Sequence, residues 1–281
     1  MTAPSSRLAT RDLTLGYADR TVVRELSLDV PDGEVTVIVG PNACGKSTLL
    51  RGLARLLRPS GGSVLLDGEE IHRMPTAAVA RTLGLLPQQP VAPEGITAAE
   101  LVSRGRHPHQ RLFRRWSRED QQAVTEAMLL TETYPLADRM VDELSGGQRQ
   151  RVWIAMALAQ QTELLLLDEP TTYLDVTHQV EMLDLVDDLN ATRGTTVVMV
   201  LHDLNLAARY ADHLVAMRDG EVVVAGPPDE VVTADTVGDV FGLDCTVVPD
   251  PLTGTPLVVP FSRRSQRGAR PELPAPTRRP A

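Results

Sequence analysis

The chain has few of the residues that would place it in several large classes of protein. Two cysteines among 281 residues, Cys44 and Cys245, provide neither a disulfide framework nor a zinc site. The longest apolar stretches, at 164–167 and 197–201, are far shorter than the roughly 18 residues of a membrane-spanning helix. The N-terminus also lacks the apolar run of a signal sequence. These absences favour a cytosolic globular protein, whose contact with any membrane would come through a partner.

Positive charge is scarce as well. The formal net charge is -9, whereas coating DNA or RNA requires clustered cations, so we expect no nucleic acid partner. The 28 basic residues include one lysine, Lys46. A compact ammonium cannot be replaced by the planar fork of arginine at every site, so this single lysine indicates a special position. The remaining composition, 42% hydrophobic and 23% charged, is typical of a globular protein with a sizeable core.

Lys46 belongs to the stretch GPNACGKST at residues 40–48. The stretch follows a buried-strand pattern at 35–39 and opens a helical pattern at 47–57, which is the context of a phosphate-binding loop. In such a loop, backbone N–H groups bind phosphate, the lysine reaches the β- and γ-phosphates, and the serine hydroxyl binds Mg²⁺. The residues expected at a nucleotide are Gly40, Pro41, Asn42, Ala43, Cys44, Gly45, Lys46, Ser47 and Thr48.

Two adjacent carboxylates, Asp168 and Glu169, end the apolar pattern LLLLDEP at 164–170. Such residues can simply mark the place where a buried strand ends and the sheet meets water. A phosphate loop upstream favours a chemical role instead. Asp168 is then a ligand of Mg²⁺, directly or through water, and Glu169 is the base that orients and deprotonates the attacking water.

A second anion site is indicated by LSGGQ at 144–148, which precedes a helical pattern. Ser145 is a residue type that caps helix N-termini, so an ordinary capped helix is one interpretation. However, two glycines at a helix start also let backbone N–H groups approach a ligand closely, and the helix dipole favours an anion there. We therefore expect Ser145, Gly146, Gly147 and Gln148 to bind phosphate.

The order of patterns along the chain predicts an α/β fold. Apolar strand patterns alternate with helical ones, which implies a mainly parallel sheet covered on both faces. Two strands within residues 7–30, joined by a turn at 18–20, precede the strand at 35–39. Helical patterns at 97–106, 117–130 and 146–160 form an insertion, and Ser117 with Asp120 predicts the N-cap of the second helix. Further helices are expected at 177–192 and 203–211.

Together, the phosphate loop, LSGGQ and LLLLDEP resemble the ATP-binding subunits of ABC transporters, over residues from about 8 to 261. The resemblance implies a P-loop NTPase of the ABC ATPase type, with a mainly parallel core, an antiparallel β subdomain and an inserted helical subdomain. It implies ATP and Mg²⁺ as cofactors and ATP hydrolysis as the activity. It also implies a head-to-tail dimer, in which each nucleotide lies between the phosphate loop of one subunit and the LSGGQ of the other.

The resemblance assigns roles to four further residues. Tyr17 matches the aromatic residue that stacks on adenine, and Asp175 matches the acidic residue that contacts the other subunit. Gln88 matches the glutamine that senses Mg²⁺ and the γ-phosphate, and His202 matches the histidine that contacts the γ-phosphate. The implied catalytic residues are therefore Glu169, His202 and Gln88, and the implied metal ligands are Ser47, Gln88 and Asp168.

Longer stretches such as LPQQPVAPEGITAAELVSRGRHPH and DEPTTYLDVTHQVEMLDLV resemble the ATPases of iron–siderophore importers. This implies a peripheral position on the cytoplasmic face of the membrane, below permease subunits that contact residues about 91–115. An external substrate-binding protein would act indirectly. The alternatives are an ATPase of a cobalamin, haem or other metal-chelate importer, a soluble ABC ATPase acting on nucleic acid or ribosomes, and a non-catalytic regulatory subunit.

The predicted domain is residues 1–262, with a helical subdomain at about 89–162 and a disordered, Arg- and Pro-rich tail at 263–281. One position departs from the family pattern, since Ala43 stands where Gly is usual. We predict a left-handed conformation for Ala43, at a cost on the order of 1 kcal/mol, and near-normal ATP binding. Cys44 is expected to offer its N–H and fill space, and an acidified, oxidisable thiol is the alternative.

Overall fold

The structure is a computed structural model that describes residues 6–18, 20–110 and 116–261. Its centre is a six-stranded sheet in the order β10 (Glu221–Gly226), β9 (His213–Arg218), β3 (Val35–Val39), β8 (Thr196–Val200), β7 (Leu164–Asp168) and β6 (Leu83–Leu86). The strands from β9 to β6 are parallel, and β10 adds an antiparallel edge. Strands β3, β7 and β8 are buried along their whole length, as their continuous apolar runs predict.

One face of this sheet is covered by α1 (Lys46–Leu53) and a second sheet. The second sheet is antiparallel, in the order β2 (Arg20–Val30), β1 (Leu8–Tyr17), β4 (Gly61–Leu66) and β5 (Glu69–Glu70). Leu49, Leu50 and Leu53 of α1 are fully buried in the shared core. The short helix α2 (Thr76–Thr82) leads from this sheet to β6.

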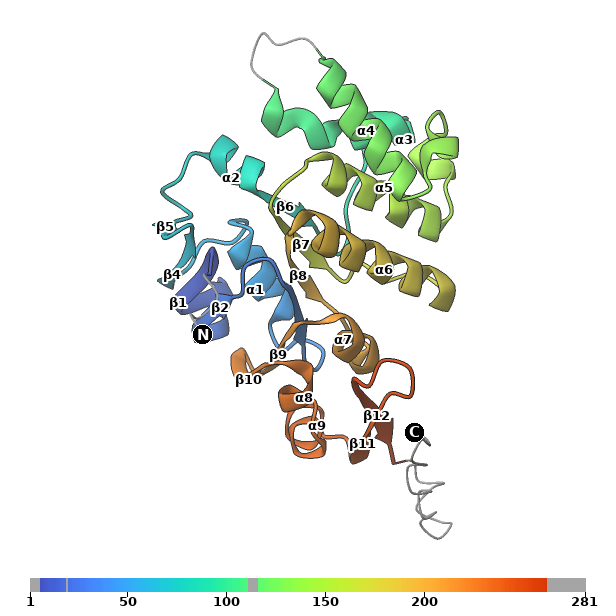
Figure 1. Ribbon diagram of the computed structural model, residues 1–281. Coiled ribbons are helices and arrows are strands. Elements are labelled where there is room, and N and C mark those ends of the chain that lie inside the picture. Colours follow the sequence, from blue (N-terminus) through green and yellow to red (C-terminus); the bar gives the residue numbers. More distant parts are fainter. Residues whose placement is uncertain (1–5, 19, 111–115, 262–281) are drawn as a thin grey trace.

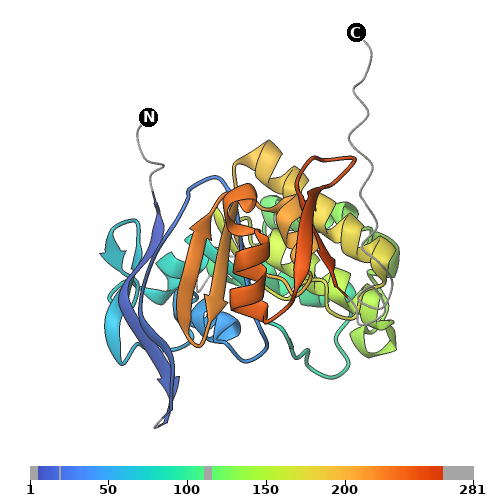
Figure 2. The ribbon, with the colours of Figure 1, turned by 90° about the horizontal axis from the view of Figure 1, so that it is seen from below.

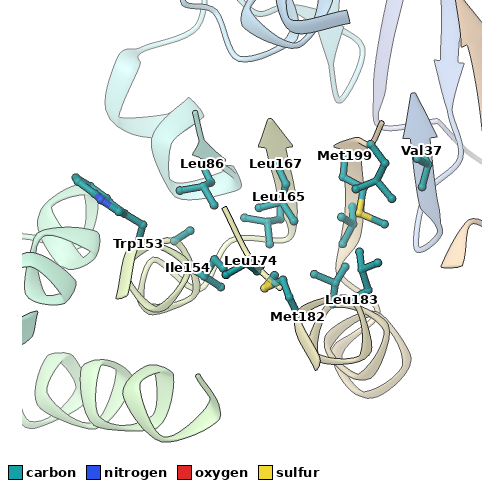
Figure 3. Packing of buried hydrophobic residues seen from close by; sticks show 14 of the residues in the cluster. Val37, Leu86, Trp153, Ile154, Leu165, Leu167, Leu174, Met182, Leu183 and Met199 are labelled. Carbon is teal, nitrogen blue, oxygen red and sulfur yellow. The ribbon is translucent and has the colours of Figure 1, made fainter. Parts of the chain in front are cut away.

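The other face is covered by α5 (Gly146–Ala159), α6 (Val176–Arg193) and α7 (Leu204–Tyr210). Figure 3 shows Leu165, Leu167 and Met199 of the sheet on the side where Met182 and Leu183 of α6 lie. Side chains alternate along a strand, so each strand contributes to both cores, which fixes the register of the whole sheet.

The predicted helical insertion lies between β6 and β7, and Figure 1 shows it at the top of the molecule. It comprises α3 (Ala98–Ser103), the 3₁₀ helices η1 (Arg104–His109), η2 (Tyr134–Leu136) and η3 (Val141–Glu143), α4 (Arg118–Leu130) and α5. The predicted N-cap of α4 is confirmed, because Ser117 and Asp120 form a capping box. Arg106 of η1 forms a buried ion pair with Asp120 at 3.0 Å, which joins the two helices.

The C-terminal part was not predicted in detail. Helices α8 (Pro228–Val231) and α9 (Ala234–Phe241) lead to a hairpin of β11 (Cys245–Pro249) and β12 (Pro256–Pro260). The hairpin packs against α7, and Figure 2 shows it as a separate two-stranded unit. The side chain of Asn205 in α7 donates to the carbonyl of Val258 at 3.3 Å and accepts its N–H at 2.8 Å.

Two predicted helix boundaries were wrong. The helix expected to end at Leu57 ends at Leu53, because Arg55 adopts a left-handed conformation with φ 62°. The pattern at 97–106 forms a short α-helix that continues as the 3₁₀ helix η1 rather than as one regular helix. The predicted tail at 263–281 lies outside the described residues.

Candidate functional site

The loop between β3 and α1 has the geometry of an anion-binding site. Gly40, Ala43 and Gly45 have φ angles of 153°, 63° and 111°, so the predicted left-handed conformation of Ala43 is confirmed. At Gly40 a side chain is excluded, since a Cβ atom would lie 2.2 Å from the carbonyl oxygen of Met217. The first intrahelical bond of α1 joins the N–H of Leu49 to the carbonyl of Gly45. The helix therefore does not use the N–H groups immediately before Leu49, and they form the positive end of its dipole.

Lys46 is 5% exposed and lies across this loop. Its Nζ donates to the carbonyls of Gly40 and Pro41 at 2.9 and 3.0 Å. Within the described residues no ion pair to Lys46 is formed, so its positive charge is held by neutral acceptors alone. Because a buried charge without a counter-charge is costly, this arrangement is suited to an anion such as a phosphate.

Asp168 and Glu169 lie at the end of β7, beside the loop, and are 2% and 7% exposed. The hydroxyl of Ser47 donates to Oδ1 of Asp168 at 2.9 Å. Burial raises the pKa of Asp168 and the Glu169 carboxylate adds to the effect, whereas the bond from Ser47 opposes it. A cation bound beside Asp168 would offset the cost of keeping this buried carboxylate charged, so a cation fits at this place.

The donor set is appropriate for Mg²⁺ bound together with a phosphate. Ser47 and Asp168 offer hard oxygen ligands, which Mg²⁺ prefers, and Mg²⁺ normally takes one or two carboxylates and completes its shell with water and phosphate. Across the described ranges, no group of three or more His, Cys, Asp and Glu residues is placed to enclose a metal ion. A cation here would therefore depend on a nucleotide for further ligands.

Glu169 follows β7 and meets two residues that follow other strands. Nε2 of Gln88 donates to Oε2 of Glu169 at 2.6 Å, and Nε2 of His202 lies 2.6 Å from Oε1. Both follow strands that neighbour β7 in the sheet, since Gln88 comes after β6 and His202 after β8. The hydroxyl of Thr172 also donates to Oε2, at 3.2 Å. Sequence reasoning missed Thr172, because a contact within an irregular turn has no periodic signal.

Gln88, Glu169 and His202 line one cavity together with residues of the phosphate loop, and its volume of about 690 Å³ is in the range of small-molecule sites. Tyr17 is 44% exposed, lies at this cavity and accepts a hydrogen bond from Arg51 at 3.2 Å. Arg20 and Val22 also line it, although no motif in the sequence marked them. The full lining is Tyr17, Arg20, Val22, Asn42, Ala43, Gly45, Lys46, Ser47, Thr48, Gln88, Glu169 and His202.

The LSGGQ segment is not part of this lining. Ser145 and Gln148 form a capping box at the start of α5, with both bonds at 3.2 Å. A Cβ atom at Gly147 would lie 3.4 Å from the side chain of Leu174, so the segment runs beside the turn that follows Glu169. One chain thus carries two separate helix N-termini that are suited to anions.

Asp175 lies in the same region, at the N-cap of α6. Its side chain accepts the N–H of His178 at 3.0 Å and lies 2.7 Å from Nδ1 of the same residue. The bond from the His178 N–H lowers the pKa of Asp175. The exposed Tyr173 and Val176 flank it, at 74% and 77% exposure, so this region presents an uncovered apolar surface next to LSGGQ.

Cys44 fills space, and the alternative of an acidified thiol was wrong. Its side chain is 5% exposed, and burial raises the pKa of the thiol, whereas the nearby Lys46 charge lowers it less. The N–H of Cys44 donates to the carbonyl of Pro41 at 3.3 Å, so it closes the loop on itself. Its carbonyl accepts the N–H of Gly220 at 2.9 Å, which anchors the loop to the turn between β9 and β10.

Comparison with known proteins agrees with this geometry. The sequence pattern of the family described as ABC transporter matches residues 23–172. Achromobactin transport ATP-binding protein CbrD of Dickeya dadantii (strain 3937) is 56% identical over 91% of this chain and 95% of its own length. Ferric enterobactin transport ATP-binding protein FepC of Escherichia coli (strain K12) is 54% identical over 94% of this chain and 97% of its own.

A solved structure shows the same fold. The ATP-binding cassette MJ0796, a dimer bound to ADP and Pi in a post-hydrolysis state, superposes with a TM-score of 0.70 at 28% identity. The match covers 78% of this chain and 98% of that chain. On the family match, the two relatives and the shared fold, this chain belongs to the ABC transporter family as an ATP-hydrolysing subunit.

Proposed function

We propose that this chain powers the import of an iron–siderophore complex through a separate membrane permease. The observation that carries the ATPase part is that Lys46, Ser47 and Glu169 line one cavity, with Asp168 hydrogen-bonded to Ser47. The substrate class rests on relatives at 54% and 56% identity whose names refer to ferric enterobactin and achromobactin transport. Nothing in the site itself would recognise a siderophore, so the transported molecule would be selected by other subunits.

The residues at the cavity take complementary roles in ATP hydrolysis. Lys46 and the loop N–H groups hold the β- and γ-phosphates, and Tyr17 stacks on the adenine. Ser47, Asp168 and Gln88 would hold Mg²⁺, which neutralises charge that develops on the phosphates. Glu169 accepts a proton from the attacking water, and His202 contacts the γ-phosphate. In this structure Gln88 contacts one oxygen of Glu169 and His202 the other, so Glu169 would receive the proton at a remaining lone pair or after one of these residues changes partner.

The second anion site acts on the nucleotide of another copy. Ser145, Gly146, Gly147 and Gln148 lie outside the cavity of their own chain, and a head-to-tail dimer would place them over the phosphates of the partner. The exposed Tyr173 and Val176, together with Asp175, would then face the other subunit. A solved neighbour with this fold is a dimer, which supports the arrangement.

The permease would contact the region of residues about 91–115, of which 111–115 lie outside the described residues. A groove of about 570 Å³ lies here and includes Glu100, His107 and Trp116 in its lining. Val91 is 88% exposed, so an apolar side chain is also available. In the ranges that the structure describes, no helix is both long and apolar enough to cross a bilayer. We place the chain on the cytoplasmic face of the membrane, held there by the permease, with residues 1–262 as its ATP-binding domain.

Glu169→Gln tests the catalytic assignment. The amide keeps the size of the carboxylate but cannot accept the proton, so we expect kcat to fall at least about a hundredfold while ATP still binds. The variant should accumulate as an ATP-bound dimer, which size-exclusion chromatography with and without ATP would detect. Rapid turnover by this variant would rule out Glu169 as the base.

Growth on single iron sources tests the transport assignment. A strain that lacks this gene should lose growth on a ferric siderophore but keep growth on free iron. The wild-type gene should restore growth, and the Glu169→Gln gene should not. Loss of growth only when cobalamin or haem is required would support the alternative importers instead. Co-purification with ribosomes or DNA, rather than with a membrane complex, would contradict the proposal as a whole.

A further inference from the structure

Glu169 adopts a conformation that a residue with a side chain rarely takes. Its φ angle is 55°, in the left-handed region, immediately after β7 ends at Asp168. This conformation is disfavoured for a non-glycine residue by about 1 kcal/mol or more. The surrounding turn must therefore hold Glu169 in place, since the extended conformation of the strand would otherwise continue.

Thr172 contacts both the main chain and the carboxylate of Glu169. The N–H of Thr172 donates to the Glu169 carbonyl at 3.2 Å, and its hydroxyl donates to Oε2 of the Glu169 carboxylate at 3.2 Å. The other groups that the structure places on this carboxylate, Gln88 and His202, come from segments that follow different strands. Thr172 belongs to the same turn as Glu169, so its contact can persist when the other two change partners.

The turn that carries Thr172 is itself fixed from two sides. Nε2 of Gln150 in α5, a residue that is 8% exposed, donates to the carbonyl of Pro170 at 3.1 Å. Nε2 of Gln179 in α6 donates to the carbonyl of Leu174 at 3.0 Å. Side chains from both flanking helices thus satisfy main-chain carbonyls of this turn, which gives Thr172 a defined position relative to Glu169.

We propose that Thr172 is a positioning residue for hydrolysis. Its hydroxyl fixes the direction of Oε2, so that the free lone pairs of the Glu169 carboxylate point into the cavity where the attacking water would lie. A base that is displaced or rotated receives the proton less efficiently, which lowers the rate of the chemical step without weakening ATP binding. This inference rests on the proposed role of Glu169 as the base.

The experiment compares Thr172→Val and Thr172→Ser in the full chain. Valine keeps the shape of threonine but lacks the hydroxyl, so we expect kcat to fall about tenfold with the KM for ATP unchanged. Serine keeps the hydroxyl and should retain most of the wild-type kcat. A kcat within twofold of wild type for Thr172→Val would overturn the proposal, and so would a parallel loss in Thr172→Ser.

Thr171→Val is the matched control. Thr171 neighbours Thr172 in the turn and is also half-buried, but among the described residues its hydroxyl makes no bond to Glu169. The kcat of Thr171→Val should remain near wild type. If kcat falls as much as in Thr172→Val, the loss comes from disturbing the turn and not from the missing Thr172 hydroxyl. Glu169→Gln measured in parallel separates the two proposals. If it retains turnover, the base assignment fails, whereas if it alone loses turnover, only the role of Thr172 fails.

Discussion

Ala43 shows how little a phosphate loop depends on side chains. Its φ angle of 63° is strained for alanine, yet the residue is exposed, so its methyl group lies at the surface of the cavity and is not buried against other side chains. Phosphate is bound through backbone N–H groups, which alanine and glycine present equally. The departure from the family pattern therefore affects the conformational energy of the loop rather than its chemistry.

Ala43→Gly should consequently change stability more than activity. Glycine relieves strain on the order of 1 kcal/mol but gains conformational freedom in the unfolded chain, so the net gain should be below about 1 kcal/mol. The KM for ATP should stay within about twofold of wild type. Thermal unfolding and steady-state ATPase kinetics measure the two quantities. A tenfold change in KM would show that the alanine side chain takes part in binding.

At the scale of elements, the helical insertion depends on one buried ion pair. Both side chains of the Arg106–Asp120 pair are 7% exposed, and Arg106 also donates to the carbonyl of Ala159 at 2.8 Å. One guanidinium therefore connects η1, α4 and α5. A buried ion pair adds little to stability while both partners are present, but the loss of one partner leaves the other charge buried and uncompensated.

Arg106→Met should therefore destabilise the chain by about 3 kcal/mol, since Asp120 keeps its bonds to Ser117 but loses its counter-charge. Arg73→Met is the control, because the Arg73–Glu70 pair is mostly solvated, with Arg73 83% exposed. That change should cost less than about 1 kcal/mol. Urea unfolding of both variants checks the contrast, and equal losses would contradict it.

The C-terminal hairpin should respond to acid. Asp250 accepts the N–H of Leu252 and pairs with Arg209 of α7 at 2.6 Å, and these contacts lower its pKa from 3.8 to about 2. The folded chain binds this proton less readily than the unfolded chain does. The charged Asp250 carboxylate therefore makes its full contribution to the free energy of unfolding above about pH 4, and this contribution is lost as the pH falls towards 2.

The stability difference between wild type and Asp250→Asn should consequently be constant from pH 7 to about pH 5 and shrink below about pH 4. Denaturant unfolding at several pH values measures it. A difference that is the same at pH 6 and pH 2.5 would show that Asp250 acts through shape rather than charge.

At the scale of the whole molecule, the proposed head-to-tail dimer implies that neither anion site is complete in one chain. The phosphate loop lines its cavity from one side, and LSGGQ lies outside that lining. The proposed head-to-tail dimer would unite the two, and two defective subunits should then complement each other. Lys46→Ala damages the loop and leaves LSGGQ intact. Gly146→Asp places a carboxylate in LSGGQ without a clash, because a Cβ atom there meets only the Tyr173 Cβ at 3.8 Å.

Each variant alone should lack ATPase activity, whereas their mixture should regain part of it. A mixed dimer contains one intact site, built from the unaltered loop of one subunit and the unaltered LSGGQ of the other. ATPase activity measured across mixing ratios should peak near equal amounts. No recovery at any ratio would contradict the head-to-tail arrangement.

The sequence by itself determined the parallel sheet and the local chemistry. Continuous apolar runs predict strands buried on both faces, and a phosphate loop is a local structure whose glycines, lysine and serine act within nine residues. The capping box of α4 was equally readable, because Ser117 and Asp120 are three residues apart. Such features depend on residues that are close together in the chain, so they can be predicted without the tertiary structure.

Tertiary structure alone decided which distant groups meet. Gln88, Glu169 and His202 converge because β6, β7 and β8 are adjacent and parallel, so the residues after them emerge at one edge. The contact from Thr172 requires the left-handed turn at Glu169, and the docking of the hairpin requires the position of α7. These contacts arise from packing between segments that are remote or irregular in sequence, where neither spacing nor periodicity carries a signal.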